Sequence, residues 1–193
     1  CKLEVGKKSY SFTNLENSLG AIHVVRDPRN IITSLKNHFS FDDENKILEF
    51  ITNENQTLGI EENEIPQLLS SWKNHYNSWK RFPKNYILIK YEDLVLNPQK
   101  EIKRLIEFLK QFFEIIFSDN QIDEIIKNSS FKNLDNLEKK GLFKENAINN
   151  KTGELKKFFN LGEKNNWKNL LSQDISNNIE QNFNDEMKEL GYL

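Results

Sequence analysis

The chain has 193 residues, of which 37% are apolar and 29% charged, and its formal net charge is −2 at pH 7. A chain of this length can bury one core, and its charge excludes a general attraction to nucleic acid or to an anionic membrane. The single cysteine excludes an internal disulfide and a cysteine-rich metal site. No apolar run reaches the roughly 18 residues of a membrane span, and no signal peptide is evident. We expect one domain over residues 1–193, located in the cytoplasm and without a metal.

The first elements are short. Residues 6–9 read Gly-Lys-Lys-Ser, which resembles the end of a phosphate-binding Walker loop. The earlier glycine and the apolar strand of that motif are missing. These residues therefore predict a turn between two short strands.

A buried strand and a capped helix follow. The segment 20–25 is short, apolar and rich in β-branched residues, which is typical of a strand in a parallel sheet. Asp27 is a suitable N-cap, and Pro28 suits the first position of a helix that we expect to end near Phe39.

The joint between this strand and helix predicts an anion site. Free N–H groups at a helix N-terminus attract a phosphate, and the forked guanidinium groups of Arg26 and Arg29 can bind it. The alternative is that Arg26 pairs with Asp27 or a nearby glutamate, in which case the loop binds nothing.

The remaining elements read as helices around few strands. Four side chains recur at helical spacing and should share one face of a helix: Trp72, His75, Tyr76 and Trp79. Such a face is typically part of the core. The alternative is that it lines an acceptor pocket. The other predicted elements are a strand at 85–90, helices at 98–110, 121–127 and 174–190, the last closed by Gly191, and a mobile loop at 133–156. This loop either folds over a bound nucleotide or is a solvated surface excursion.

Four segments, taken in order, resemble the motifs of the PAPS-dependent sulfotransferases, where PAPS is 3′-phosphoadenosine 5′-phosphosulfate. They are residues 22–34, Tyr91-Glu92-Asp93-Leu94 with Asn97-Pro98, Ser129-Ser130-Phe131, and residues 158–162 with Trp167-Lys168. The resemblance implies an α/β fold of the sulfotransferase type, related to P-loop nucleotide enzymes, with a parallel sheet flanked by helices.

The resemblance also implies the cofactor-binding residues. An arginine and a serine spaced like Arg26 and Ser34 hold the 3′-phosphate of the nucleotide in this family. The family's tyrosine, here Tyr91, lies near the adenine, which Ser129 and Phe131 also contact. An aromatic face suits a purine. The alternative for Tyr91 and Phe131 is a role in core packing alone.

The last motif departs from the family. Asn160 stands where the family has a basic residue, shortly before Gly162 of the segment that clamps the same phosphate. Asparagine can donate a hydrogen bond but has no charge, so we expect weaker cofactor binding. Lys156, Lys157 or Lys164 is a candidate to compensate.

The family's Gly-rich phosphate loop and its Lys-Thr-His catalytic segment have no counterpart in these residues. We therefore expect an N-terminally incomplete fold, in which His23, His38 and His75 are structural and no catalytic residue is assigned. An exposed sheet edge pairs readily with another strand, and exposed apolar surface readily contacts another apolar surface. We expect the chain to self-associate or to fold its N-terminal residues over that edge.

The implied reaction is transfer of a sulfuryl group from PAPS to a hydroxyl or amine, leaving adenosine 3′,5′-bisphosphate. Positioning of the reactants and charge stabilisation would supply most of the reduction of the activation barrier, as in phosphoryl transfer. The acceptor is not identified by the sequence. Two alternatives are a catalytically incomplete nucleotide-binding or interaction domain that keeps only the 3′-phosphate site, and a nucleotide or nucleoside kinase relative that uses ATP and Mg²⁺.

Overall fold

The computed structural model describes residues 2–5, 7–11, 13–39, 43–59, 65–82, 84–143, 153 and 156–193. The strands are β1 Lys2–Val5, β2 Lys8–Ser11, β3 Gly20–Val25, β4 Thr57–Leu58, β5 Gln67–Leu68 and β6 Asn85–Lys90. The helices are α1 Pro28–His38, α2 Glu44–Thr52, α3 Trp72–Lys80, α4 Tyr91–Leu96, α5 Pro98–Leu109, α6 Asp119–Ser129, α7 Phe131–Lys139, the 3-10 helix η1 Gly162–Lys164, α8 Trp167–Leu170, α9 Gln173–Asn182 and α10 Asn184–Leu190.

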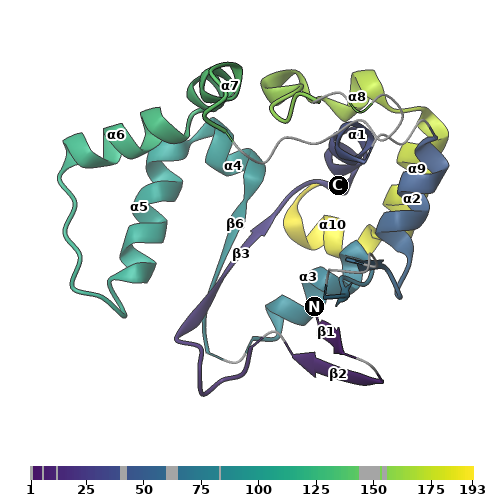
Figure 1. The fold of residues 1–193 in the computed structure, drawn as a ribbon, viewed down its shortest axis with the longest axis horizontal. Helices are drawn as coiled ribbons and strands as arrows, with labels where there is room; N and C mark the ends of the chain where they lie inside the picture. The colour runs from purple at the N-terminus through teal and green to yellow at the C-terminus, as the bar shows by residue number, and fades with distance from the viewer. Residues whose placement is uncertain are drawn as a thin grey trace.

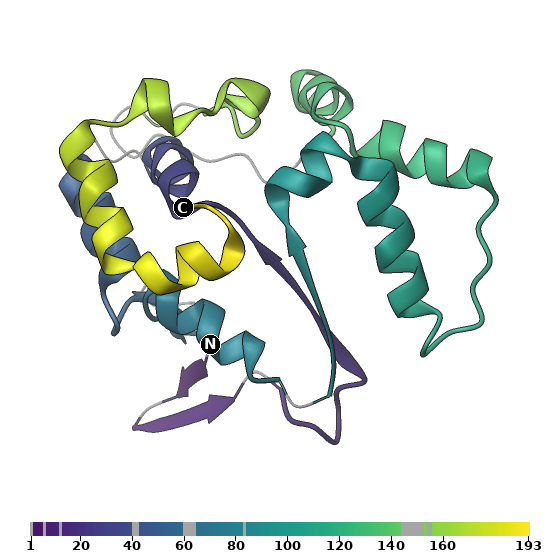
Figure 2. The ribbon, with the colours of Figure 1, turned by 180° about the vertical axis from the view of Figure 1, so that it is seen from behind.

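Strands β3 and β6 form a parallel pair, as the sequence predicts for residues 20–25 and 85–90. The register runs from Gly20 opposite Asn85 to Val25 opposite Lys90. Figures 1 and 2 show α5, α6 and α7 on one side of these strands and α1, α2, α3, α9 and α10 on the other. The expected parallel sheet flanked by helices is therefore confirmed.

The two faces of β3 differ in burial. His23 and Val25 are buried, with Val25 packed against Tyr76 of α3. On the opposite face, Ile22 and Val24 are 47% and 52% exposed. This alternation follows from the two-residue period of a strand. It leaves apolar surface on β3.

A second, antiparallel sheet has the strand order β2-β1-β5-β4. The β1–β2 hairpin confirms a turn between two short strands in the predicted region 6–9, although Lys8 and Ser9 already belong to β2 and Gly6 lies outside the described residues. Strand β1 pairs with β2 and β5, so these two N-terminal strands belong to a separate sheet and do not pair with β3. Self-association of the chain stays a prediction.

Helix α1 begins as the sequence predicts. The carboxylate of Asp27 accepts the N–H of Arg29, and Pro28 is the first helical residue. The helix ends at His38, one residue before the expected end. Its N-terminus lies directly after β3, which fixes the direction of its free N–H groups.

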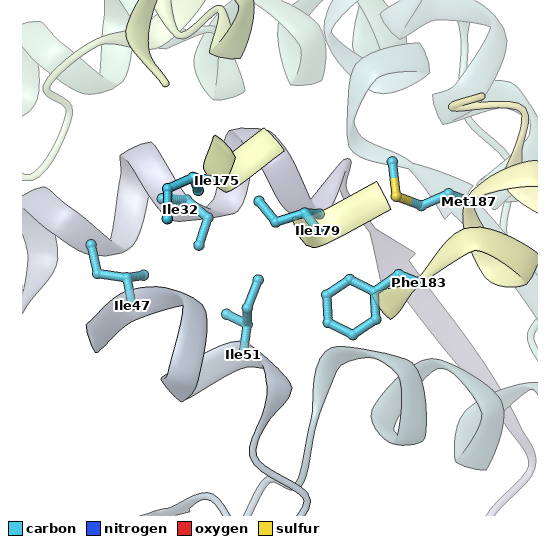
Figure 3. Packing of buried hydrophobic residues seen from close by; sticks show 7 residues of the cluster. All are labelled: Ile32, Ile47, Ile51, Ile175, Ile179, Phe183 and Met187. Carbon is cyan, nitrogen blue, oxygen red and sulfur yellow. The ribbon is translucent and has the colours of Figure 1, made fainter. Parts of the chain in front are cut away.

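The main hydrophobic core joins α1, α2, α9 and α10 (Figure 3). Its buried members are Ile32, Ile47, Ile51, Ile175, Ile179, Phe183 and Met187. The last four of these residues recur every four positions and lie within the helix predicted over 174–190. The single predicted helix over 174–190 is nevertheless wrong, because the chain breaks at Phe183 into α9 and α10. Gly191, with φ of 70°, ends α10 as expected.

The predicted loop over 133–156 is also wrong in its first part. Ser130 accepts the N–H of Asn133 and caps α7, which runs to Lys139. An ion pair between Asp135 and Lys139, four residues apart, supports this helix. Residues 144–152 lie outside the described part of the chain. Helices α3, α5 and α6 occupy the regions predicted for them.

Candidate functional site

Arg26 and Tyr91 lie together at the carboxyl ends of the parallel strands. Arg26 follows β3 and Tyr91 follows β6, so the in-register pairing of Val25 with Lys90 places them side by side. The guanidinium carbon of Arg26 lies 4.3 Å from the centroid of the Tyr91 ring. Among the described residues, Nε of Arg26 is buried and has no hydrogen-bond partner. A buried donor without an acceptor is unusual and calls for a ligand or water.

Arg29 is bound by other groups. Its side chain is buried and forms ion pairs with Asp27 at 2.7 Å and with Glu180 of α9 at 2.6 Å. It also stacks on Trp167, with its guanidinium carbon 4.0 Å from the centroid of the ring. Burial alone would lower the pKa of Arg29, but its hydrogen bonds with Asp27 and Glu180 raise it overall. The expectation that Arg29 faces an anion is therefore wrong, and the arginine that pairs with Asp27 is Arg29 rather than Arg26.

One face of α1 holds the segment that leads into α8. Thr33 donates a hydrogen bond to the Asn165 side chain, whose amide donates to the Asn30 carbonyl at 3.1 Å. The N–H of Trp167 donates to the Asn30 side chain at 3.0 Å. Ser34 is exposed and lies four residues beyond Asn30, so it borders the same face.

Phe131 and Gly162 are in direct contact. Gly162 has φ of +53°, and a Cβ placed there would lie 2.5 Å from Cζ of Phe131. The Phe131 ring also meets Phe159 edge to face, with centroids 6.0 Å apart. Because only glycine leaves room for the ring, the Phe131–Gly162 contact fixes η1 against the start of α7.

Ser129 and Asn160 are exposed. The Ser129 hydroxyl donates to the carbonyl of Ile125, within α6, at 2.7 Å. The N–H of Asn160 donates to the carbonyl of Phe158 at 3.0 Å. Neither contact joins these residues to Arg26. Among the expected cofactor residues, Arg26 contacts Tyr91 and Phe131 contacts Gly162. The other three, Ser34, Ser129 and Asn160, are exposed.

The lysines near Asn160 differ in their contacts. Lys157 forms an ion pair with Asp135 at 2.6 Å, and Nζ of Lys156 donates to the carbonyl of Asn37 at 2.8 Å. Lys164 is exposed. Compensation for the missing basic residue by any of them stays a prediction.

Two of the three histidines are packed between β3 and α3. Nδ1 of His23 lies 2.8 Å from the hydroxyl of Tyr86, and its ring lies 5.7 Å from that of His75. Burial, with the nearby His75 as a smaller cause, lowers the pKa of His23 to about 4. Burial also lowers the pKa of His75. His38 is exposed and packs edge to face against Phe39.

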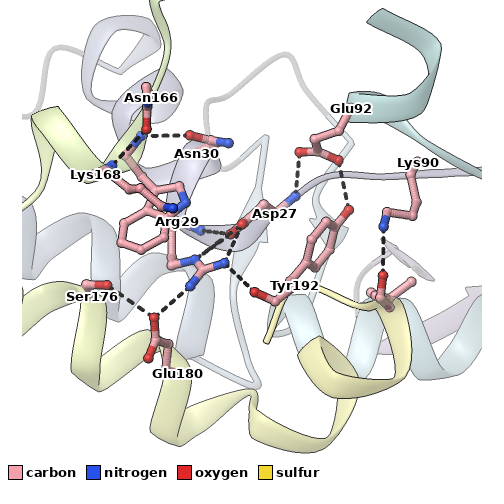
Figure 4. Close-up of polar contacts among 12 residues, drawn as sticks. Asp27, Arg29, Asn30, Lys90, Glu92, Asn166, Lys168, Ser176, Glu180 and Tyr192 are labelled. Carbon is pink, nitrogen blue, oxygen red and sulfur yellow. Dashed lines mark hydrogen bonds and ion pairs between the residues drawn. The ribbon is translucent and has the colours of Figure 1, made fainter. Parts of the chain in front are cut away.

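Two further residues, Glu92 and Tyr192, connect the strand ends (Figure 4). One carboxylate oxygen of Glu92 accepts the N–H of Asp27 at 3.0 Å, and the other accepts the hydroxyl of Tyr192 at 2.9 Å. Sequence reasoning identified Glu92 only as part of a motif. It gave no signal for Tyr192, because that contact spans 100 residues.

The family model for the sulfotransferase domain matches residues 10–191. The chain belongs to the sulfotransferase family. This match decides against the kinase alternative. Cytosolic sulfotransferase 6 of Arabidopsis thaliana is 30% identical over 125 residues, which are 64% of this chain and 36% of that protein. Sulfotransferase 1E1 of Bos taurus is 29% identical over 129 residues, or 65% of this chain and 41% of that protein.

Solved structures support the fold of this sulfotransferase domain. Mouse sulfotransferase SULT7A1 complexed with PAP matches with a TM-score of 0.56 and 17% identity, over 86% of this chain and 57% of that one. Retinol dehydratase in complex with androsterone and inactive cofactor PAP matches with a TM-score of 0.56 and 18% identity, over 86% and 47%. The domain thus spans well under two thirds of these relatives' lengths.

Two features are not found in the described part of the domain. None of its helices combines the length and the apolar character needed to cross a membrane. No three side chains of His, Cys, Asp or Glu come together there in a way that suits a metal ion.

Proposed function

We propose that this domain binds the nucleotide of PAPS through its 3′-phosphate and adenine, and that the protein transfers the sulfuryl group to a hydroxyl or amine acceptor. The observation that carries the proposal is the Arg26 guanidinium, which lies over Tyr91 with a buried, unpartnered Nε among the described residues. The adjacent N-terminus of α1 adds partial positive charge. A phosphate placed there would accept a hydrogen bond from Nε of Arg26 and would also interact favourably with the partial positive charge of the α1 N-terminus.

The roles of the other residues are those that the resemblance to the sulfotransferases implies. Ser34, farther along α1, is assigned to the same phosphate, which Arg26 would reach along the helix. Tyr91 is assigned to the adenine side, with Phe131 and Ser129 at the junction of α6 and α7. The segment with Asn160 and Gly162 lies against α7 and is assigned to the 3′-phosphate.

The donor fits these residues. When bound, PAPS supplies the sulfuryl group that is transferred. Arg26 provides charge-assisted hydrogen bonds to its 3′-phosphate, which are stronger than neutral ones. Tyr91 restricts the position of the nucleotide, and such positioning lowers the entropic barrier of a transfer reaction. The structures of mouse sulfotransferase SULT7A1 and of retinol dehydratase, both in complex with PAP, support this choice of donor.

A second candidate is a domain that binds the nucleotide without turnover of its own. It is favoured by the packing of His23 and His75 between β3 and α3, where His23 is buried and the two ring centroids lie 5.7 Å apart. A histidine base for the acceptor proton is therefore not assigned to either residue.

Isothermal titration with adenosine 3′,5′-bisphosphate, ATP and AMP tests the proposal. Preference for the bisphosphate over both controls is expected, because only it carries a 3′-phosphate. Equal affinity for all three, or no binding of the bisphosphate, would contradict the proposed site. Turnover of PAPS with a simple phenol then separates the transferase from the domain that only binds.

A further inference from the structure

Tyr192 contacts both of the strand–helix turns that carry the nucleotide residues. Its hydroxyl donates to Glu92, the residue after Tyr91, at 2.9 Å. Its backbone carbonyl accepts a hydrogen bond from Arg29 at 2.8 Å. Figure 4 shows the tyrosine between these two partners. A single residue after α10 thus ties the turn after β6 to the first turn of α1.

The position of Tyr192 is itself fixed. Its N–H donates to the carbonyl of Met187 at 2.8 Å, and the N–H of Gly191 donates to Lys188 at 3.1 Å. These two bonds form a Schellman motif around the left-handed Gly191, which ends α10. The centroid of the Tyr192 ring also lies 4.7 Å from Nζ of Lys90, which stands over the face of the ring. The residue can therefore transmit the position of α10 to the site.

Glu92 relays this contact to the arginine turn. Its second oxygen accepts the N–H of Asp27, which directly follows Arg26. The hydrogen bond from a hydroxyl to a carboxylate is charge-assisted and directional. Burial raises the pKa of Tyr192, and the neighbouring carboxylate of Glu92 raises it further, so the hydroxyl stays protonated and remains a donor.

We propose that Tyr192 is a positioning residue of the nucleotide site, which acts through Glu92 to hold the Arg26 guanidinium over the Tyr91 ring. This inference rests on the proposed function. Tyr192 does not touch the assigned ligand position. It restricts the two turns relative to each other, so that Arg26 and Tyr91 meet the nucleotide in one arrangement.

Tyr192→Phe is the test, because it removes the hydroxyl and keeps the ring and the backbone carbonyl. We expect its affinity for adenosine 3′,5′-bisphosphate to fall roughly three- to tenfold, the scale of couplings that act through an intermediate residue. Tyr86→Phe is the matched control. It removes another tyrosine hydroxyl, which contacts His23 at 2.8 Å, and should leave the affinity unchanged.

A spectroscopic readout on the ligand-free chain makes the test independent of binding. The Nε proton of Arg26 lies near the Tyr91 ring, so its NMR resonance carries a ring-current shift. We expect that shift to diminish in Tyr192→Phe and to persist in Tyr86→Phe. A merely structural hydroxyl would lower the melting temperature in both variants without moving this resonance.

A double-mutant cycle tests the route through Glu92. Glu92→Ala should weaken binding at least as much as Tyr192→Phe, and the hydroxyl deletion should then have no further effect. Additive losses, or an unchanged affinity and Arg26 resonance in Tyr192→Phe, would overturn the inference. If the wild-type chain does not bind the bisphosphate, the proposed function fails, and the Arg26 resonance still decides whether Tyr192 positions that side chain.

Discussion

The carboxylate of Asp27 binds the guanidinium of Arg29, two residues along the chain. Nε of Arg29 donates to Oδ1 at 3.0 Å, and Nη2 donates to Oδ2 at 2.7 Å. Both side chains are buried. Arg26, on the other side of Asp27, has no carboxylate partner among the described residues. Two nearby arginines therefore differ in their contacts: Arg29 holds the turn together, whereas Nε of Arg26 is buried without a hydrogen-bond partner among the described residues.

Arg29→Ala should destabilise the fold strongly. The change leaves the buried Asp27 carboxylate without its charge partner and removes the contact to Glu180. Breaking one side of a buried ion pair costs about 3–5 kcal/mol. Urea denaturation measures this loss, with Arg81→Ala as the control, because Arg81 is exposed at the end of α3. Equal free energies of unfolding for the two variants would show that the pair contributes little.

Gly162→Ala should cost more stability than another glycine replacement. The left-handed backbone at φ of +53° costs an L-residue about 1–2 kcal/mol, and the new Cβ would also collide with Phe131. Gly141→Ala is the matched control, with φ of +69° and no atom within 4 Å of its Cβ position. Thermal unfolding of both variants isolates the packing contribution. Losses of the same size would argue against a close Phe131–Gly162 contact.

Asn160→Arg should strengthen nucleotide binding. It introduces the charge that the family places before this glycine, and an exposed charged contact of this kind should raise the affinity for adenosine 3′,5′-bisphosphate about three- to tenfold. AMP, which has no 3′-phosphate, should bind as before. Asn169→Arg adds the same charge on α8, at an exposed position. If both variants gain equally, the effect is a general attraction rather than a contact at position 160.

Stability should fall as the pH decreases from about 6.5 to about 4, because His23 is held neutral in the folded chain. Burial lowers its pKa from 6.5 to about 4. Between these values the unfolded chain binds one more proton than the folded chain, so the free energy of unfolding rises with pH. The contribution of neutral His23 to stability is fully present above pH 6.5. The expected loss between pH 7 and pH 5 is about 2 kcal/mol. His23→Asn should reduce this slope, whereas His38→Asn should retain it; a steep slope in both variants would assign the effect to other groups.

The start of the site is predictable from sequence because its signals are local. Asp27 and Pro28 sit next to each other at a helix start, and residues 20–25 form a short β-branched run. These features require no knowledge of distant contacts. The parallel pairing with β6 then follows from a second run of the same kind, and it places Arg26 beside Tyr91.

The partners of these residues are not predictable in the same way. Arg29 is paired with Glu180, which lies 151 residues away, and nothing near position 29 distinguishes it from Arg26 as the paired arginine. Helix α7 was missed for a different reason. Its many Asn, Lys and Glu residues are typical of a loop, although the Ser130 cap and the Asp135–Lys139 spacing are helix signals. In this segment the cap and the ion-pair spacing, rather than the composition, indicate the structure.

The affinities of the wild-type chain and of Arg26→Ala for adenosine 3′,5′-bisphosphate and for AMP test the assignment of Arg26 most directly. If Arg26 binds the 3′-phosphate, the variant should lose roughly tenfold or more of its affinity for the bisphosphate and little of its affinity for AMP, because only one ligand carries that phosphate. Arg81→Ala should bind both ligands as the wild type does. A preference for the bisphosphate that is the same in wild type and Arg26→Ala would contradict the assignment.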